Sequence, residues 1–517
     1  TDGFGHGRTR IYNESTGLIK LDGEESVGMF LNNNSTSYIG TTSNNLGTIE
    51  MSGNKAIGML VKAPEVNSST YNYGTININS DQEGIGMVAS GEAFARNDAT
   101  GLINLKSSSS KYKPNIGMFT NDKNSSLANY GNIIGGDNTY GMYGNHIDHR
   151  DNKIKLGNNS VGIFSSTKDD YTYFDSADGE IEVGNNSTAV FVSGDNNSIM
   201  QNTSKITIGD NSFGFVLKTN GSTLENDYTQ ETKLGNESVY IYSSDKTGTI
   251  TNSTPLKTTG NKNYGIYATG NVTNLADMNL GSGIGNIGMY ALSDGRIING
   301  ELGGTSQPTI TVGKGDISKD TYSIGMVAEN PTNLGTRTIE NYGKIDVVEE
   351  AGIGMYAAGN GSKAINHLGA EINLSGQDSI GMYLTDNAVG ENYGTIRTAP
   401  NNTKDGIIGV LVTNNAIIKN YGNIIIDGKN NTGIYISANG QVEGKTIPPS
   451  SPTPSIQMPV ATNGADAFKS KTQSDTTKKI VGLEIKAKPN EPVTITRKDK
   501  IVTPVHIDTI PSIIMLP

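Results

Sequence analysis

A short phrase, Ile-Gly-Met followed by an aromatic or aliphatic residue, recurs along residues 1–440 and limits the folds that this chain can adopt. Its central Gly serves as an anchor for sixteen units, with Ala189 and Tyr240 where two units lack the Gly. The units average roughly 27 residues, a length typical of a solenoid, in which each unit buries its apolar face against the next. The anchors are Gly28, Gly58, Gly86, Gly117, Gly141, Gly162, Gly214, Gly265, Gly288, Gly325, Gly354, Gly381, Gly409 and Gly433.

A second phrase, Asn-Tyr-Gly-x-Ile, precedes many anchors and predicts a turn followed by a strand. It occurs at 72–76, 129–133, 341–345 and 420–424. The stretch from its Gly to the next anchor hardly changes in length, as at 343–354 and 422–433, whereas the arc that leads up to it varies more. One arc of each unit is therefore nearly constant in length, and the other is adjustable.

Apolar residues alternate with polar residues inside the constant arc, as at Ile76 and Ile78. This period of two indicates a strand with one buried face, and no segment keeps a helical period. Because a single unit cannot bury its own apolar face, the units must stack at about 4.8 Å per rung. The sequence therefore predicts an all-β fold, a right-handed parallel β-helix of about 16 coils.

The composition indicates a thin core that hydrogen-bonded ladders stabilise. Gly numbers 65 and Phe only 10, and Trp is absent, so large side chains cannot fill a thick globular core. The anchor Gly permits a sharp bend or a close approach of two backbones, and the Met and aromatic residues beside it are expected in the core. Asn is nearly as abundant as Gly. It tolerates left-handed turns and can form a ladder with the Asn above and below it.

Charge and cysteine content exclude several functions. The net charge of -11 argues against nucleic acid or anionic lipid as the main partner, because both need a basic surface. The absence of Cys excludes disulfides and thiolate metal sites. No apolar run approaches the ~18 to 20 residues of a membrane-spanning helix, so we expect no direct membrane insertion. No cofactor is predicted.

The end of the repeat predicts three regions. Residues 1–440 are expected to form the β-helix, 441–475 a Pro/Ser/Thr-rich linker, and 476–517 a small β-rich segment or cap. The linker contains a Pro-rich run at 448–454, which favours polyproline structure. A cap is expected because the end of a β-helix exposes unpaired backbone groups.

Tandem Ile-Gly-Met-Tyr units that alternate with Asn-Tyr-Gly-x-Ile, in a chain without Cys, resemble the passenger repeats of very large fusobacterial type V autotransporter adhesins. The resemblance covers residues 11–440. It implies a rod displayed at the cell surface and anchored in the outer membrane by a C-terminal translocator barrel outside this chain. It also implies a partner: a host-cell glycan, a protein receptor that includes immune receptors, or a partner bacterium. The rod is expected to be monomeric.

Binding in a β-helix is expected on loops that leave the regular wall. Polar and aromatic residues follow Gly141 and Gly162 at similar offsets, so we expect the two segments to lie side by side on one edge. Aromatic faces beside carboxylates and a guanidinium suit a sugar ring or a protein hot spot, and solvated loops are the alternative. The candidate ligand-binding residues are His146, His149, Arg150, Asp169, Asp170, Tyr171, Tyr173 and Phe174.

Two further features bear on binding. His146 and His149 have no clear third ligand near them in the sequence, so no metal site is predicted. The unit between Gly288 and Gly325 is the longest of the sixteen. Its segment 303–308 predicts a projecting loop and a second contact surface.

Three functions are compatible with these repeats. We expect an adhesin rather than an enzyme, and the first alternative is a passive stalk that carries a distal binding tip. A polysaccharide lyase or hydrolase is the second alternative, because such enzymes use the same fold. A glycosidase needs two carboxylates held about 5 to 10 Å apart. Asp169 and Asp170 are neighbours in an expected loop, where such a geometry is hard to maintain.

Overall fold

The protein is an all-β parallel β-solenoid of about 15 turns, which confirms the predicted fold class. The described residues contain a single helical element, the 3₁₀ turn η1 (Ile317–Lys319). Contacts divide the chain into two compact units, residues 1–228 with 483–517 and residues 229–482, and each unit is described by itself. The computed structural model describes residues 10–33, 41–120, 122–166, 173–193, 199–304, 307–319, 321–428, 430–444, 483–486, 494–497 and 501–502.

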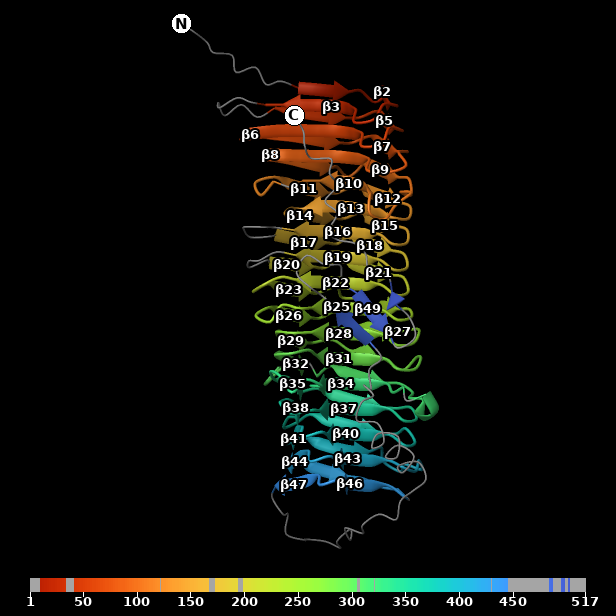
Figure 1. Ribbon diagram of the computed structural model, residues 1–517, viewed down its shortest axis with the longest axis vertical. Helices are drawn as coiled ribbons and strands as arrows, with labels where there is room; N and C mark the ends of the chain where they lie inside the picture. The colour runs from red at the N-terminus through yellow and green to blue at the C-terminus, as the bar shows by residue number, and fades with distance from the viewer. Residues whose placement is uncertain are drawn as a thin grey trace. The chain divides into compact units, whose positions relative to one another are not determined.

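Three strands make up a turn of the solenoid, and within each unit the solenoid strands pair in parallel with their counterparts in the neighbouring turns (Figure 1). The strands that carry the anchor position form the anchor wall. The next strand of a turn usually ends at an Asn, and these strands form the asparagine wall. The third strand carries the alternating apolar residues and belongs to the alternating wall.

In unit 1 the strands β6 (Ile57–Asn72) and β8 (Ile85–Asn97) run through both the anchor wall and the asparagine wall. The other anchor-wall strands are β3 (Val27–Asn32), β10 (Asn115–Phe119), β13 (Thr139–Gly144), β16 (Val161–Ser166), β19 (Thr188–Ser193) and β22 (Phe213–Lys218). The other asparagine-wall strands are β1 (Arg10–Asn13), β4 (Thr42–Asn45), β11 (Ser126–Asn129), β14 (His146–Arg150), β17 (Tyr173–Ala177), β20 (Ile199–Asn202) and β23 (Thr223–Asn226). The alternating wall contains β2 (Leu18–Leu21), β5 (Thr48–Met51), β7 (Thr75–Ile78), β9 (Leu102–Leu105), β12 (Asn132–Gly135), β15 (Lys153–Leu156), β18 (Glu180–Val183) and β21 (Lys205–Ile208).

Unit 2 repeats the same three walls. Its anchor wall contains β25 (Val239–Ser243), β28 (Tyr264–Ala268), β31 (Ile287–Ala291), β34 (Ile324–Glu329), β37 (Ile353–Ala358), β40 (Ile380–Thr385), β43 (Ile408–Val412) and β46 (Thr432–Ile436). Its asparagine wall contains β26 (Thr249–Asn252), β29 (Asn271–Asn274), β32 (Gly295–Asn299), β35 (Arg337–Asn341), β38 (Ser362–Asn366), β41 (Val389–Asn392), β44 (Ile417–Asn420) and β47 (Gln441–Gly444). Its alternating wall contains β24 (Thr232–Leu234), β27 (Leu256–Thr258), β30 (Met278–Asn279), β33 (Thr309–Val312), β36 (Lys344–Val347), β39 (Glu371–Leu374), β42 (Thr395–Thr398) and β45 (Asn423–Ile425).

Identical side chains stack from turn to turn in the core. The strand register of unit 1 aligns the Met of successive anchor phrases, and all of these Met side chains are buried. Ile76 and Ile78 of β7 are also buried, as the alternation in the sequence predicts. The aligned Met residues are Met29, Met59, Met87, Met118 and Met142.

The anchor Gly allows two backbones to approach closely. A Cβ added to Gly58 would lie 2.6 Å from the carbonyl oxygen of Gly86, and one on Gly354 would lie 2.5 Å from that of Gly381. A side chain there would force neighbouring rungs apart, so of the two predicted roles of the anchor Gly, close approach is confirmed.

The sharp bend falls three residues before the anchor, where most turns have one residue with positive φ. This left-handed residue turns the chain from the alternating wall into the anchor wall, and Asn and Gly adopt that conformation at the lowest cost. The residues at this corner are Glu25, Lys55, Glu83, Asn138, Asn159, Asn186, Asn211, Glu237, Lys262, Gly285, Ala351, Asp378, Gly406 and Asn430.

Three short strands near the C-terminus differ from the solenoid because they pair antiparallel. They are β48 (Leu483–Lys486), β49 (Thr494–Arg497) and β50 (Ile501–Val502). The Pro-rich run at 448–454 lies outside the described residues. The boundaries at 440 and 475 therefore stay predictions.

Candidate functional site

The two segments predicted to form a binding patch do lie in neighbouring turns. Strands β14 and β17 pair in parallel, with His146 opposite Tyr173 and Ile147 opposite Phe174. For Tyr173 and Phe174 only this backbone register is described, and Asp169, Asp170 and Tyr171 lie outside the described residues. The prediction of a projecting loop at 146–150 is wrong, because these residues form a strand of the asparagine wall.

His149 requires a correction, because its side chain is fully buried rather than exposed to a ligand. One ring nitrogen lies 3.1 Å from Nδ2 of Asn129, and the other lies 3.4 Å from the carbonyl oxygen of Glu180. Burial lowers the pKa of His149 to about 4, although backbone hydrogen bonds oppose this shift. His146 is half-buried, and partial desolvation lowers its pKa as well.

Arg150 takes part in a polar network that was not predicted from the sequence. Its Nε donates to Oδ1 of Asp148 at 2.7 Å, and the hydroxyl of Tyr130 donates to the other oxygen of that carboxylate at 2.9 Å. The Arg96 guanidinium lies 4.9 Å from the ring centroid of Tyr71 and 5.4 Å from that of Tyr130. Cationic and aromatic groups therefore alternate across successive turns of unit 1.

A column of Asn side chains runs along the asparagine wall, which confirms the predicted ladder. His149 occupies one position of this column. Where Asn occupies the position in two successive turns of a unit, Nδ2 of the earlier Asn donates to Oδ1 of the later one, at 2.8 Å in unit 1 and at 2.7–3.0 Å in unit 2. In unit 1, His149 and Ser176 interrupt the column. The ladder residues are Asn13, Asn45, Asn72, Asn97 and Asn129, then Asn202 and Asn226, in unit 1, and Asn252, Asn274, Asn299, Asn341, Asn366, Asn392 and Asn420 in unit 2.

Aromatic residues directly after the ladder Asn gather on one edge of unit 2. The rings of Tyr342 and His367 stack with a centroid distance of 3.8 Å, and those of Tyr393 and Tyr421 stack at 5.1 Å. Leu368 beside them is 86% exposed, and Tyr421 is 53% exposed. We call these five residues the aromatic edge. The sequence contained the signal, since three of them belong to Asn-Tyr-Gly phrases, but the phrase was interpreted only as a turn.

A buried carboxylate ties the aromatic edge to the wall. Glu340 accepts two hydrogen bonds from Arg296, at 2.6 and 3.1 Å, and lies 2.9 Å from Nε2 of His367. Burial disfavours the Glu340 carboxylate, but its hydrogen bonds with His367 and Arg296 outweigh this effect and lower its pKa to about 2. The bidentate guanidinium and the stacked ring hold this part of the edge in one geometry.

The predicted projection at 303–308 is described only in part, because residues 305 and 306 lie outside the described residues. Leu302, just before it, is 83% exposed. Within the described part of the chain, no group of three or more His, Asp or Glu side chains could hold a metal ion. No helix among the same residues is long and apolar enough to cross a membrane.

A family model matches most of this chain. It is described as the BigA third pectate lyase-like domain, and it covers residues 5–131 and 151–367. No curated protein matches the chain.

Proposed function

Because the chain belongs to the family of the BigA third pectate lyase-like domain, we propose that it is a surface-displayed adhesin, a β-helical autotransporter passenger that binds ligands on other cells. The ligand is a glycan or a protein receptor on a host cell, which includes immune receptors, or a ligand on a partner bacterium. Anchoring in the outer membrane through a translocator barrel outside this chain is part of the same proposal.

The aromatic edge is the observation that supports binding most directly. It exposes Tyr393, Tyr421 and Leu368 at the ends of strands, although most apolar side chains of unit 2 are buried. The few residues that carry most of the energy in protein interfaces are enriched in Trp, Tyr and Arg. Strand ends hold such groups more rigidly than loops, so less entropy is lost on binding. His146, Arg150 and the residues predicted within 169–174 stay a second candidate surface, without the buried His149.

Cell binding tests the proposal. We would measure binding of the whole chain to host cells and partner bacteria, and compare it with the variant Tyr393→Ser, Tyr421→Ser, Leu368→Ser. We expect at least a tenfold loss of affinity, about 1.4 kcal/mol, because the variant removes exposed contact area without disturbing the core. A matched control replaces three exposed apolar residues of unit 1, Tyr12→Ser, Leu18→Ser and Leu46→Ser.

Other outcomes would favour the alternatives. If the native chain binds no cell that is tested, the passive stalk becomes the better interpretation. Release of unsaturated or reducing sugar from a polysaccharide would favour a lyase or a hydrolase instead. Equal loss in both triple variants would mean that the aromatic edge has no special role.

A further inference from the structure

A second binding site is suggested by an enlarged corner in unit 1, between the alternating wall and the anchor wall. The segment 106–114 separates β9 from β10 and is longer than any other segment that makes the same connection in this unit, such as 79–84 or 136–138. The position three residues before Gly117 holds Pro114, and Pro cannot adopt the positive φ that most turns use there. A loop therefore replaces the tight corner.

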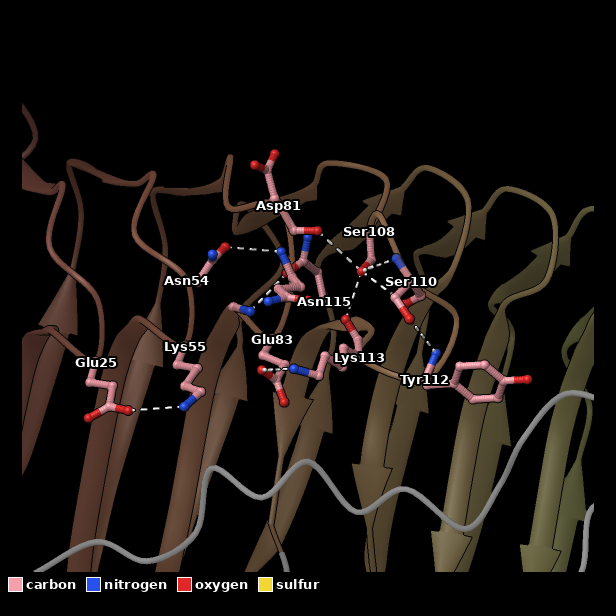
Figure 2. A network of polar contacts seen from close by, with 12 residues as sticks. Glu25, Asn54, Lys55, Asp81, Glu83, Ser108, Ser110, Tyr112, Lys113 and Asn115 are labelled. Carbon is pink, nitrogen blue, oxygen red and sulfur yellow. Dashed lines mark hydrogen bonds and ion pairs between the residues drawn. The ribbon is translucent and has the colours of Figure 1, made fainter.

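Side-chain hydrogen bonds make this loop rigid (Figure 2). The hydroxyl of Ser108 donates to the carbonyl oxygen of Lys113 at 2.7 Å, and the amide of Lys113 donates to the carbonyl oxygen of Ser110 at 3.1 Å. Asn115 donates to the carbonyl oxygens of Ser80 and Lys106, at 2.9 and 3.0 Å. A loop held this way loses little entropy when it binds a ligand.

Two ion pairs tie the ends of the loop to the turn that precedes it. Lys106 lies 2.7 Å from Asp81, and Lys113 lies 3.7 Å from the buried carboxylate of Glu83. Lys111 lies in the loop between Lys106 and Lys113, and among the described residues no carboxylate pairs with it. Lys111 contacts the ring of Tyr112 but none of these carboxylates, so its ammonium can still pair with an anion.

Lys111 stands beside an exposed aromatic ring. Its Nζ lies 5.2 Å from the ring centroid of Tyr112, which is 44% exposed and is labelled in Figure 2. An ammonium binds a carboxylate, and an aromatic ring packs against the C–H face of a pyranose. The ammonium lies over the ring at the distance of a cation–π contact, so the two groups are close enough to touch one ligand together. The chain as a whole is acidic, with a net charge of -11, so its overall charge does not attract anions. Attraction of a carboxylate to this loop would come from Lys111 itself.

We propose that the loop 106–115 binds a sugar that carries a carboxylate, such as a uronic or a sialic acid. Lys111 pairs with the carboxylate, and Tyr112 packs against the ring. This site lies in unit 1 and does not depend on the aromatic edge of unit 2, so either site can be lost while the other is kept.

The test compares ligands that differ in charge. We would titrate the whole chain with methyl glucuronide and with methyl glucoside, in which a hydroxymethyl group replaces the carboxylate. A sialyl-lactose and lactose pair distinguishes the two sources of carboxylate. We expect binding of at least one acidic sugar, at least fivefold weaker binding of its neutral partner, and weakening of the acidic complex as salt is raised.

Variants then assign the binding to the loop. Lys111→Ala and Tyr112→Ala should each weaken binding of the acidic sugar at least fivefold, and both leave in place the hydrogen bond from Ser108 to Lys113 and the ion pairs of Lys106 and Lys113. The matched control is Lys20→Ala with Tyr12→Ala, which removes an exposed cation and an exposed ring elsewhere in unit 1. Equal binding of acidic and neutral sugars, no binding of either acidic sugar, or native affinity in Lys111→Ala would each overturn the proposal. Loss of cell binding in the aromatic-edge variant bears only on the adhesin proposal.

Discussion

At the scale of single residues, His149 is unusual because it places a titratable side chain in a fully buried position of the asparagine wall. His149 stands in a column that Asn fills in most turns, and its ring keeps hydrogen bonds on both sides. Its identity suggested a surface role, because His is often found at functional sites. Its burial could not be predicted from the sequence, since a polar residue that faces the core breaks the apolar alternation by which buried positions are recognised.

The stability of unit 1 should depend on His149 as pH falls. Its folded pKa of about 4 lies below the usual value of 6.5, so the unfolded chain binds the proton more readily between these values. Stability is therefore full above pH 6.5 and is lost progressively down to about pH 4, by on the order of 3 kcal/mol. In His149→Asn this part of the slope should vanish. Urea midpoints at pH 7, 5.5 and 4.5 measure it, and an unchanged slope would contradict the assignment.

The left-handed corner at Ala351 offers a gain in stability. Ala351 has a φ of 55° and is buried, whereas Gly285 and Gly406 fill the same corner of other turns. Ala351→Gly should raise the free energy of unfolding by up to about 1 kcal/mol, because relief of strain exceeds the added entropy of the unfolded chain. Ala357→Gly, in the middle of β37, is the control and should lower it by about 1 kcal/mol. Urea unfolding compares the two, and a loss at both positions would show that the corner is not strained.

At the scale of strands, the alternation and the two phrases were enough to predict the walls. The pattern at Ile76 and Ile78 predicted the alternating wall, and the abundance of Asn predicted the ladder. The strand at 146–150 was interpreted as a loop, because its inward positions include His149 as well as Ile147. The stacking of Tyr393 on Tyr421 was missed, because pairing across turns depends on register rather than on local sequence.

Loss of an Asn inside the ladder should lower the free energy of unfolding more than loss of the Asn at its end. Asn341→Ala removes a hydrogen bond from Asn299 and another to Asn366, both at 3.0 Å, and leaves buried amide groups unpaired. We expect a loss of on the order of 2 to 4 kcal/mol. Asn420→Ala, at the last rung, should cost only about 1 kcal/mol, since its environment is half-buried. Urea unfolding with hydrogen exchange of β35 and β38 measures the difference, and equal costs would argue against the ladder as a stabilising element.

At the scale of the whole chain, the repeat period predicted the architecture and the number of turns closely, about 16 against about 15. Composition excluded a thick core, and the fold agrees with it. The repeat does not predict where a ligand binds, because the phrases that form the walls are similar in every repeat. The enlarged corner at 106–114 and the aromatic edge depend on which side chains meet across turns, and that becomes visible only in three dimensions.

The chain should tolerate the loss of one whole turn. Deleting 354–380, from one anchor up to the residue before the next, joins Ile353 to Gly381 and keeps every wall in register. We expect the same β-sheet circular dichroism with a slightly lower melting temperature, because stability in a solenoid is a sum over neighbouring units. Deleting 354–366 instead removes half a turn and should abolish cooperative melting. Similar behaviour of the two deletions would contradict the stacking of equivalent units.

The Asn ladder also has a direction. In every pair of the column the amide nitrogen of the earlier turn faces the amide oxygen of the later one, from Asn252 through to Asn420 in unit 2. A rung added in the opposite sense, or a strand from another copy laid on a ladder end in reverse, would bring two donors or two acceptors together. The direction of these hydrogen bonds thus favours new rungs in one orientation only. It disfavours the edge-to-edge association to which open sheets are prone.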